Sequence, residues 1–209
     1  MIKAIFWDND GVLVDTEGLF FRANEETLAD AGINLRWEQF EEISLTRGGS
    51  VLQLAADPGT EKFYKLRNKR DALYAALLTR EPLVIDGVRE VLEALSRKYL
   101  MGIVTSSGHE HFEIIHRKSG LLRYFQFVLT MKDCLNTKPH PEPYLKALEL
   151  SGFTPEECLV IEDSPRGLAA ALSAGIRCIA VPSRFTGGNN FAGAYKVLTS
   201  IKELPAALI

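Results

Sequence analysis

Acidic side chains are concentrated near the N-terminus of the chain, in the segment FWDNDGVLVDTE at residues 6–17. Asp8 and Asp10 are separated by one residue, and Gly11 follows directly. The residues before Asp8 are mostly apolar and are typical of a buried strand, so two carboxylates stand where that strand ends. An Asp-Gly pair alone is a common turn. Partners elsewhere in the chain would be needed to give these acids a chemical role.

Three further groups of polar residues follow apolar runs of the strand type, and they are Thr105 with Ser106, Lys138, and Glu162 with Asp163. Ligands of open parallel sheets bind beyond the carboxyl ends of the strands. We therefore expect these groups to converge with Asp8 and Asp10 at one edge of a sheet. Taken alone, Lys138 could be a surface lysine before a helix. The polar groups at the other strand ends make this alternative less favoured.

The chemistry of these residue types is coherent. The carboxylates of Asp8, Asp10 and Asp163 supply hard oxygen ligands, which suit magnesium. A hydroxyl at position 105 or 106 and the ammonium group of Lys138 suit a phosphate group. A carboxylate can attack phosphorus to form an acyl phosphate while positive charge neutralises the phosphoryl oxygens. The sequence thus predicts magnesium-dependent phosphoryl transfer.

Strand and helix patterns alternate in the second part of the chain. Helices are predicted at 86–98, 109–118, 141–152 and 164–175, and strands at 100–105, 125–130, 158–162 and 177–181. Asp86 is the expected N-cap of the first of these helices, and Gly152 is the expected end of the third. The pattern predicts an α/β fold with a Rossmann-like parallel sheet and helices on both faces.

The segment between the first strand and this alternating part has only helical periodicity, at 18–32, 36–45 and 61–80. We therefore predict two domains. A core would be formed by residues 1–14 and 85–209, and an all-helical domain would be inserted at residues 15–84.

At this point the chain resembles the haloacid dehalogenase (HAD) superfamily. DNDG at 8–11, the Thr of IVTSS, the Lys of KPHPEPY and the EDS of VIEDSPRG are similar to its four motifs, in order. The resemblance covers nearly the whole chain and is strongest to the beta-phosphoglucomutase-like phosphatases. It implies a Rossmann-like catalytic core and identifies the helical insertion as a cap domain.

The resemblance also implies roles for the core residues. Asp8 would be the nucleophile, and Asp10 the general acid and base, with its backbone carbonyl on the magnesium ion. Thr105 would bind the phosphoryl oxygens, and Lys138 would stabilise both nucleophile and phosphate. Asp163 would ligate magnesium, with Glu162 as a further ligand or a group behind the ligands.

Three further residues, Gly11, Ser106 and Arg47, are candidates for binding substrate or phosphate. Arg47 matches a cap residue that contacts substrate in phosphoglucomutase-like relatives, and a solvated arginine is the alternative. Asn9 stands at a position that is more often apolar in the family, and its side chain is expected to point away from the chemistry.

The function that this resemblance implies is a magnesium-dependent phosphatase of a small, sugar-phosphate-like metabolite, with an aspartyl-phosphate intermediate. The alternative is a beta-phosphoglucomutase-like sugar phosphomutase. Those mutases usually carry a His and a Trp on the first cap helix, where this chain has Phe20 and Asn24, whereas Arg47 is kept. A non-enzymatic binding protein would be expected to have lost one of the core residues.

Composition limits the partners. The 209 residues carry a net charge of −3, which argues against nucleic acid as a partner. No apolar stretch is long enough to span a membrane, and the three cysteines lack disulfide or zinc spacing. We expect a soluble, cytoplasmic monomer that binds a small phosphorylated metabolite.

Overall fold

The computed structural model describes residues 1–208, which divide into two compact units. Of the described residues, the core unit contains 1–15 and 83–208, and the helical unit contains Thr16–Pro82. In sequence, the helical unit is an insertion between the two segments of the core unit.

The core unit is built on a parallel sheet with the strand order β3-β2-β1-β4-β5-β6. The strands are β1 (Ala4–Trp7), β2 (Leu100–Val104), β3 (Phe127–Leu129), β4 (Cys158–Glu162), β5 (Arg177–Ala180) and β6 (Lys196–Val197). Each neighbouring pair is parallel, which confirms the predicted fold class. The sequence analysis missed β6, whose two residues are exposed and lack an apolar pattern.

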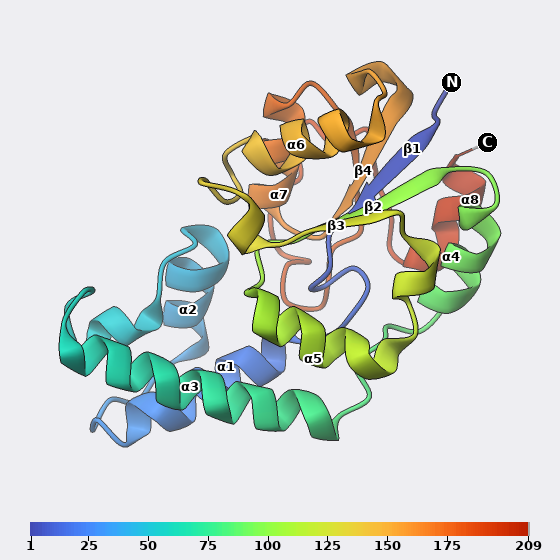
Figure 1. Ribbon diagram of the computed structural model, residues 1–209. Helices are drawn as coiled ribbons and strands as arrows, with labels where there is room; N and C mark the ends of the chain where they lie inside the picture. The colour runs from blue at the N-terminus through green and yellow to red at the C-terminus, as the bar shows by residue number, and fades with distance from the viewer. Residues whose placement is uncertain (209) are drawn as a thin grey trace. The chain divides into compact units, whose positions relative to one another are not determined.

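Helices cover both faces of this sheet (Figure 1). On one side lie α6 (Glu142–Ser151) and α7 (Pro165–Ser173), and on the other α4 (Val88–Ser96), α5 (His109–Ser119) and α8 (Leu204–Ala207). Because side chains alternate along a strand, Phe6 joins the apolar cluster that contains Tyr144 of α6. Its neighbour Trp7 packs edge-on against Phe125. The same alternation continues in the residues directly after β1, so neighbouring side chains there face helices on opposite sides of the sheet.

Short helical turns connect these elements: η3 (Leu122–Tyr124), η4 (Met131–Asp133), η5 (Pro155–Glu157) and η6 (Ile201–Glu203). The predicted end of α6 at Gly152 is confirmed, since this glycine has a left-handed φ of 70°. The predicted N-cap at Asp86 is wrong. The cap residue of α4 is Gly87, with φ 85°, and Asp86 instead forms an exposed ion pair with Lys202 at 2.5 Å.

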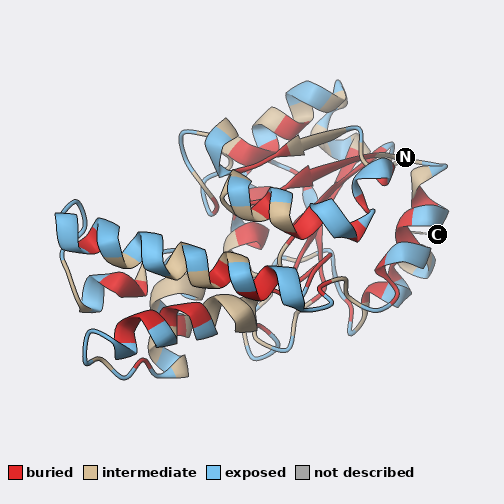
Figure 2. Cartoon of the chain, turned by 60° about the horizontal axis from the view of Figure 1, so that its bottom comes forward, coloured by how far each residue is buried: buried red, intermediate tan, exposed pale blue. Residues whose placement is uncertain are grey.

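The helical unit contains α1 (Glu17–Ala29), α2 (Trp37–Phe40), the π-helical turn η1 (Glu41–Thr46), the turn η2 (Val51–Leu54) and α3 (Glu61–Arg80). Figure 2 shows that buried and exposed positions recur along α1 and α3, as expected for amphipathic helices. Phe20 packs against Phe40 and Tyr74, and the buried Asn24 donates to the carbonyl of Phe20 at 2.8 Å. Phe20 and Asn24 therefore contribute to the packing and internal bonding of this unit.

Candidate active site

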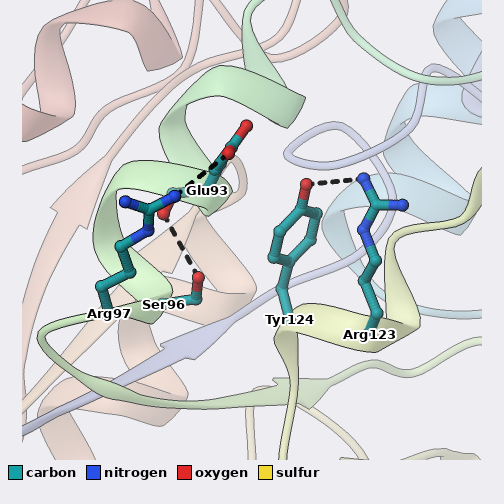
Figure 3. Close-up of a pocket in the computed structure, with 5 residues that line it drawn as sticks. All are labelled: Glu93, Ser96, Arg97, Arg123 and Tyr124. Atoms are coloured by element: carbon teal, nitrogen blue, oxygen red, sulfur yellow. Dashed lines mark hydrogen bonds and ion pairs between the residues drawn. The ribbon is translucent and has the colours of Figure 1, made fainter.

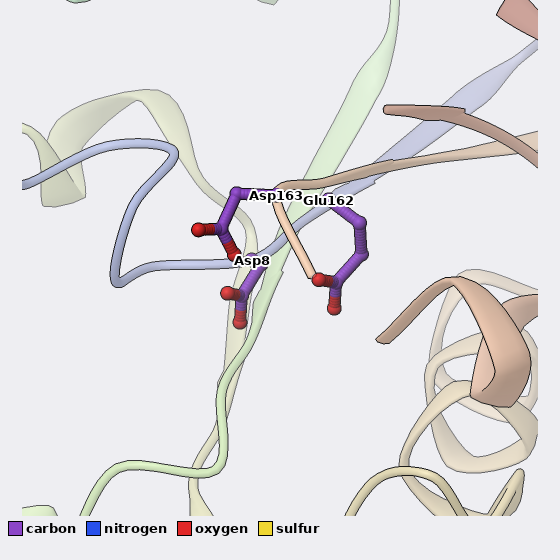
Figure 4. Close-up of side chains that lie close together, drawn as sticks. All are labelled: Asp8, Glu162 and Asp163. Carbon is purple, nitrogen blue, oxygen red and sulfur yellow. The ribbon is translucent and has the colours of Figure 1, made fainter. Parts of the chain in front are cut away.

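The carboxyl ends of β1 and β4 bring three acidic side chains together. The backbone N–H of Asp8 donates to the carbonyl of Ile161 at 2.9 Å, so pairing of β1 with β4 continues into the acidic segment. Asp8, Glu162 and Asp163 each place one carboxylate oxygen within 4.8 Å of the others. Figure 4 shows these side chains meeting where the two strands end. Sequence positions more than 150 apart thus share one site.

Lys138 is the buried cation of this site. Its Nζ donates to Oδ1 of Asp8 at 2.7 Å, to Oε1 of Glu162 at 2.6 Å and to the carbonyl of Val104 at 2.7 Å. An ammonium group has three N–H donors, so all three are engaged. Arg166 donates to the backbone carbonyl of Lys138 and so contacts the loop that carries it. This arrangement fixes Lys138 against the Asp8 carboxylate.

Glu162 is completely buried, and both of its carboxylate oxygens accept hydrogen bonds. Besides Lys138, its Oε1 accepts from the hydroxyl of Tyr144 at 2.7 Å, and its Oε2 accepts from Ser164 at 3.1 Å. The side chain also lies over Gly167, where an added Cβ would stand 1.8 Å from Cδ of Glu162. Glu162 therefore holds Lys138, and its bonds favour a place behind the metal ligands over a place among them.

The charges in this network shift one another's pKa. Burial, followed by the negative charge of Glu162, raises the pKa of the Asp8 carboxyl to about 8, although Lys138 acts in the opposite direction. Burial by itself would lower the pKa of Lys138, but the facing carboxylates of Asp8 and Glu162 outweigh it and raise that pKa. Lys138 alone thus compensates only part of the buried negative charge.

Asp10 lies at the start of a tight loop and is surrounded by neutral donors. Its Oδ2 accepts from the hydroxyl of Thr105 at 3.4 Å, from the amide of Asn9 at 3.3 Å and from the hydroxyl of Ser107. The expectation that Asn9 points away from the chemistry is therefore wrong. Ser107 was missed by the sequence analysis, which named its half-buried neighbour Ser106; the signal was a second hydroxyl two residues after Thr105.

Asp163 lies directly against the loop that carries Asp10. A Cβ at Gly11, whose φ is 79°, would stand 2.1 Å from Oδ2 of Asp163, so only glycine leaves room there. The buried hydroxyl of Thr186 donates to the same oxygen at 3.3 Å. Gly11 therefore serves this site by allowing the close approach of Asp163.

The donor set fits a hard divalent cation. Carboxylate oxygens of Asp8 and Asp163 lie close together, with no histidine or thiol among them, as Mg²⁺ prefers. Burial and, after it, the negative charge of Glu162 raise the pKa of Asp8, so without a further cation the site disfavours the ionised form of Asp8. A cation here would favour the ionised form of Asp8.

Arg47, the remaining candidate, belongs to the helical unit. It follows η1 and forms an ion pair with Glu42 at 2.5 Å, with its side chain 72% exposed. Within its own unit it therefore behaves as a surface residue.

A separate hollow of about 400 Å³ lies on the core unit between α4 and η3 (Figure 3). Its charged groups bind neighbours that also line it. Arg97 pairs with Glu93 at 3.4 Å, and Arg123 donates to the hydroxyl of Tyr124 at 2.8 Å. The hydroxyl of Ser96 donates to the backbone carbonyl of Glu93 on the same helix, and the ion pair of the hollow is exposed, so we do not consider it the active site.

Comparisons with known proteins identify the family of the chain. Residues 5–181 match the family described as Haloacid dehalogenase-like hydrolase. The chain is 29% identical to protein CbbY of Cereibacter sphaeroides, with 98% of this chain and 94% of that protein covered. It is 32% identical to the phosphorylated carbohydrates phosphatase of Thermotoga maritima, with 85% and 84% covered.

Solved structures give the same result. The crystal structure of CbbY from Rhodobacter sphaeroides in complex with phosphate superposes with a TM-score of 0.83 at 28% identity, covering 98% of this chain and 96% of that one. Another structure of that protein contains xylulose 1,5-bisphosphate.

Among the residues that the structure describes, no helix is both long and apolar enough to cross a membrane.

Proposed function

The chain belongs to the haloacid dehalogenase-like hydrolases, and we propose that it is a magnesium-dependent phosphatase that cleaves a small phosphorylated carbohydrate through an aspartyl phosphate on Asp8. The observation that carries this proposal is the buried ion network at the end of β1. A nucleophilic carboxylate needs a fixed orientation and an anionic substrate needs positive charge, and Lys138 supplies both next to Asp8.

In the first step, the Asp8 oxygen that does not accept from Lys138 forms a bond to phosphorus, while the bond between phosphorus and the sugar oxygen breaks. Asp10 donates the proton that the leaving oxygen takes up. The hydroxyls of Thr105 and Ser107, which now contact Asp10, are positioned to bind phosphoryl oxygens.

In the second step, Asp10 accepts a proton from water, whose oxygen bonds to phosphorus as the acyl-phosphate bond breaks. Phosphate is released and the Asp8 carboxylate returns. Asp8, Asp163 and the backbone carbonyl of Asp10 would hold magnesium, which when bound supplies positive charge to the phosphoryl oxygens. Glu162 keeps Lys138 charged and in place through both steps.

The relatives support a carbohydrate substrate. One of them is named a phosphorylated carbohydrates phosphatase, and a structure of another contains a bisphosphorylated pentulose. We therefore propose a sugar monophosphate or bisphosphate as the substrate class.

The test is phosphate release from a panel of sugar phosphates, with and without magnesium. We expect release that stops when a chelator is added, and that falls by about a thousandfold or more in Asp8→Asn. The matched control is Asp86→Asn, the same change at an exposed ion pair, which should keep full activity.

Chelator-insensitive release, or an active Asp8→Asn, would contradict the proposal. Conversion of a hexose 1-phosphate into its isomer without phosphate release would instead identify the phosphomutase that the sequence left open.

A further inference from the structure

A buried histidine on α5 has no role in the mechanism above. His116 is 4% exposed, and its Nε2 lies 2.8 Å from Oδ1 of Asn9. Its Nδ1 lies 2.9 Å from the hydroxyl of Ser119, one turn further along the helix. Asn9 is completely buried and its amide nitrogen lies 3.3 Å from Oδ2 of Asp10. Four side chains, two from the segment after β1 and two from α5, thus form a continuous chain that ends on the Asp10 carboxylate.

Strand alternation explains how this contact arises. Phe6 and Asp8 point toward the side of the sheet that carries α6 and Lys138, whereas Trp7 points to the other side. Asn9 follows Trp7 by two positions and therefore faces α5. An apolar residue at position 9 would fill this place, but only a polar one can link α5 to Asp10.

The direction of the hydrogen bonds follows from chemistry. A carboxylate only accepts, so the Asn9 amide must donate to Asp10 through its nitrogen. Its oxygen then accepts, which requires a proton on Nε2 of His116. The Nδ1 of a neutral imidazole accepts in turn, and Ser119 donates to it. Every donor in the chain therefore points toward Asp10.

Burial keeps the imidazole of His116 in its neutral form. Burial lowers the pKa of His116 to about 4, although the charge of Asp10 acts in the opposite direction. Near neutral pH the ring is uncharged, with one nitrogen donating and one accepting. In that form Nδ1 accepts from Ser119, whereas a protonated ring would donate from Nδ1 to the hydroxyl oxygen of Ser119, whose own proton can bond the backbone carbonyl of His116 at 3.4 Å.

We propose that Asn9 and His116 are positioning residues that hold the Asp10 carboxylate in line with the leaving-group oxygen. This inference rests on the proposed function, because it assigns a purpose to the acid and base of that reaction. If the inference is correct, substitutions of Asn9 or His116 slow the steps in which Asp10 transfers a proton. They slow the other steps much less.

Two kinds of substrate separate these steps. Release of p-nitrophenolate from p-nitrophenyl phosphate needs no proton on the leaving oxygen, whereas release of a sugar from a sugar phosphate does. Release of inorganic phosphate from the phosphoenzyme also needs Asp10, as the base. Single-turnover measurements with both substrates, on the full chain with magnesium, follow the release of p-nitrophenolate, of the sugar and of inorganic phosphate.

For Asn9→Leu, which keeps the side chain's size, we expect sugar release and phosphate release to slow by about tenfold, the effect of one lost orienting hydrogen bond. Nitrophenolate release should slow by less than about threefold, and KM should change little. His116→Gln, whose amide can still donate to Asn9, should recover most of the rate, and His116→Phe should not.

The double variant Asn9→Leu/His116→Phe separates positioning from folding. It removes both polar partners, so no buried group is left without a hydrogen bond and stability should recover relative to either single variant. The slow proton-transfer steps should remain slow. If all three events instead fall together in each variant, or if rates recover along with stability, the pair is merely structural and the inference is wrong.

The wild-type chain separates this failure from that of the proposed function. If it releases no phosphate from any substrate, the phosphatase proposal fails and the inference falls with it. If it releases phosphate and Asn9→Leu matches it at every step, only the inference is overturned.

Discussion

Two groups of side chains in the core unit pair positive and negative charges in different surroundings. At the strand ends, Lys138 bonds Asp8 and Glu162 at 2.7 and 2.6 Å, and these side chains are at most 12% exposed. At the hollow beside α4, Arg97 and Glu93 pair at 3.4 Å with side chains 77% and 62% exposed. The second pair is open to water, whereas the first group is largely shielded from it.

The difference shows where chemistry can be built. An exposed ion pair contributes little free energy to folding, because water screens the two charges. Burying a charged network costs desolvation free energy, which the attraction between its charges does not fully offset. The buried network nevertheless fixes the orientation of the Asp8 carboxylate, and its burial raises the pKa of Asp8. We infer that the buried network serves the phosphoryl-transfer reaction and not stability. Among the described residues, the hollow beside α4 has no buried ion network.

The largest expected contrast comes from deleting one cation in each place. Lys138→Met leaves the buried carboxylates of Asp8 and Glu162 without their cation and should lower the free energy of unfolding by about 3–5 kcal/mol. Arg97→Met should change it by less than about 0.5 kcal/mol. Urea unfolding with a chelator present measures both, and equal effects would remove the distinction between the two regions.

A smaller contrast concerns pH. His116 has a pKa of about 4 in the folded chain against 6.5 for an ordinary histidine, so the unfolded chain binds the extra proton first. The stability that this histidine contributes is complete above pH 6.5 and is lost as pH falls toward 4, by up to about 3 kcal/mol.

The check is the free energy of unfolding from pH 7 to pH 4 for wild type and His116→Gln, which should lack this part of the decline. The control is His109→Gln on the same helix, where the half-exposed imidazole pairs with Glu113 at 3.2 Å. Parallel curves for wild type and His116→Gln would refute the assignment.

The smallest contrast concerns two glycines. Gly167→Ala would drive a methyl group into the Glu162 carboxylate and should destabilise the chain by about 1–3 kcal/mol. Activity should fall as well, because Glu162 holds Lys138. Gly188→Ala, where no heavy atom lies within 4 Å of the added methyl group, should change neither quantity, and thermal unfolding with a phosphate assay compares them.

These contrasts also show how far sequence reasoning reached. Alternating strand and helix patterns predicted the parallel sheet, since buried parallel strands are continuous apolar runs. The rule that parallel strand ends converge predicted that Asp8, Lys138 and Asp163 would share a site. Both predictions depend on regular backbone geometry, which the sequence pattern encodes directly.

The predictions were wrong where the outcome depends on the direction of a side chain or on the backbone angles of one residue. Asp86 looked like a helix cap, but Gly87 adopts the left-handed conformation from which α4 begins. Asn9 looked irrelevant, because no local pattern indicates that a histidine 107 residues away meets its side chain. Likewise, which of Ser106 and Ser107 reaches Asp10 depends on the turn after β2, and spacing alone does not fix it.

The central claim is that Asp8 accepts the phosphoryl group. The most direct test is to mix the enzyme with magnesium and a sugar phosphate that it hydrolyses, stop the reaction with acid within one turnover, and locate added mass by peptide mass spectrometry. We predict one phosphoryl group on Asp8, absent from Asp8→Asn. Rapid turnover without any phosphorylated peptide, or with the group on another residue, would contradict the account.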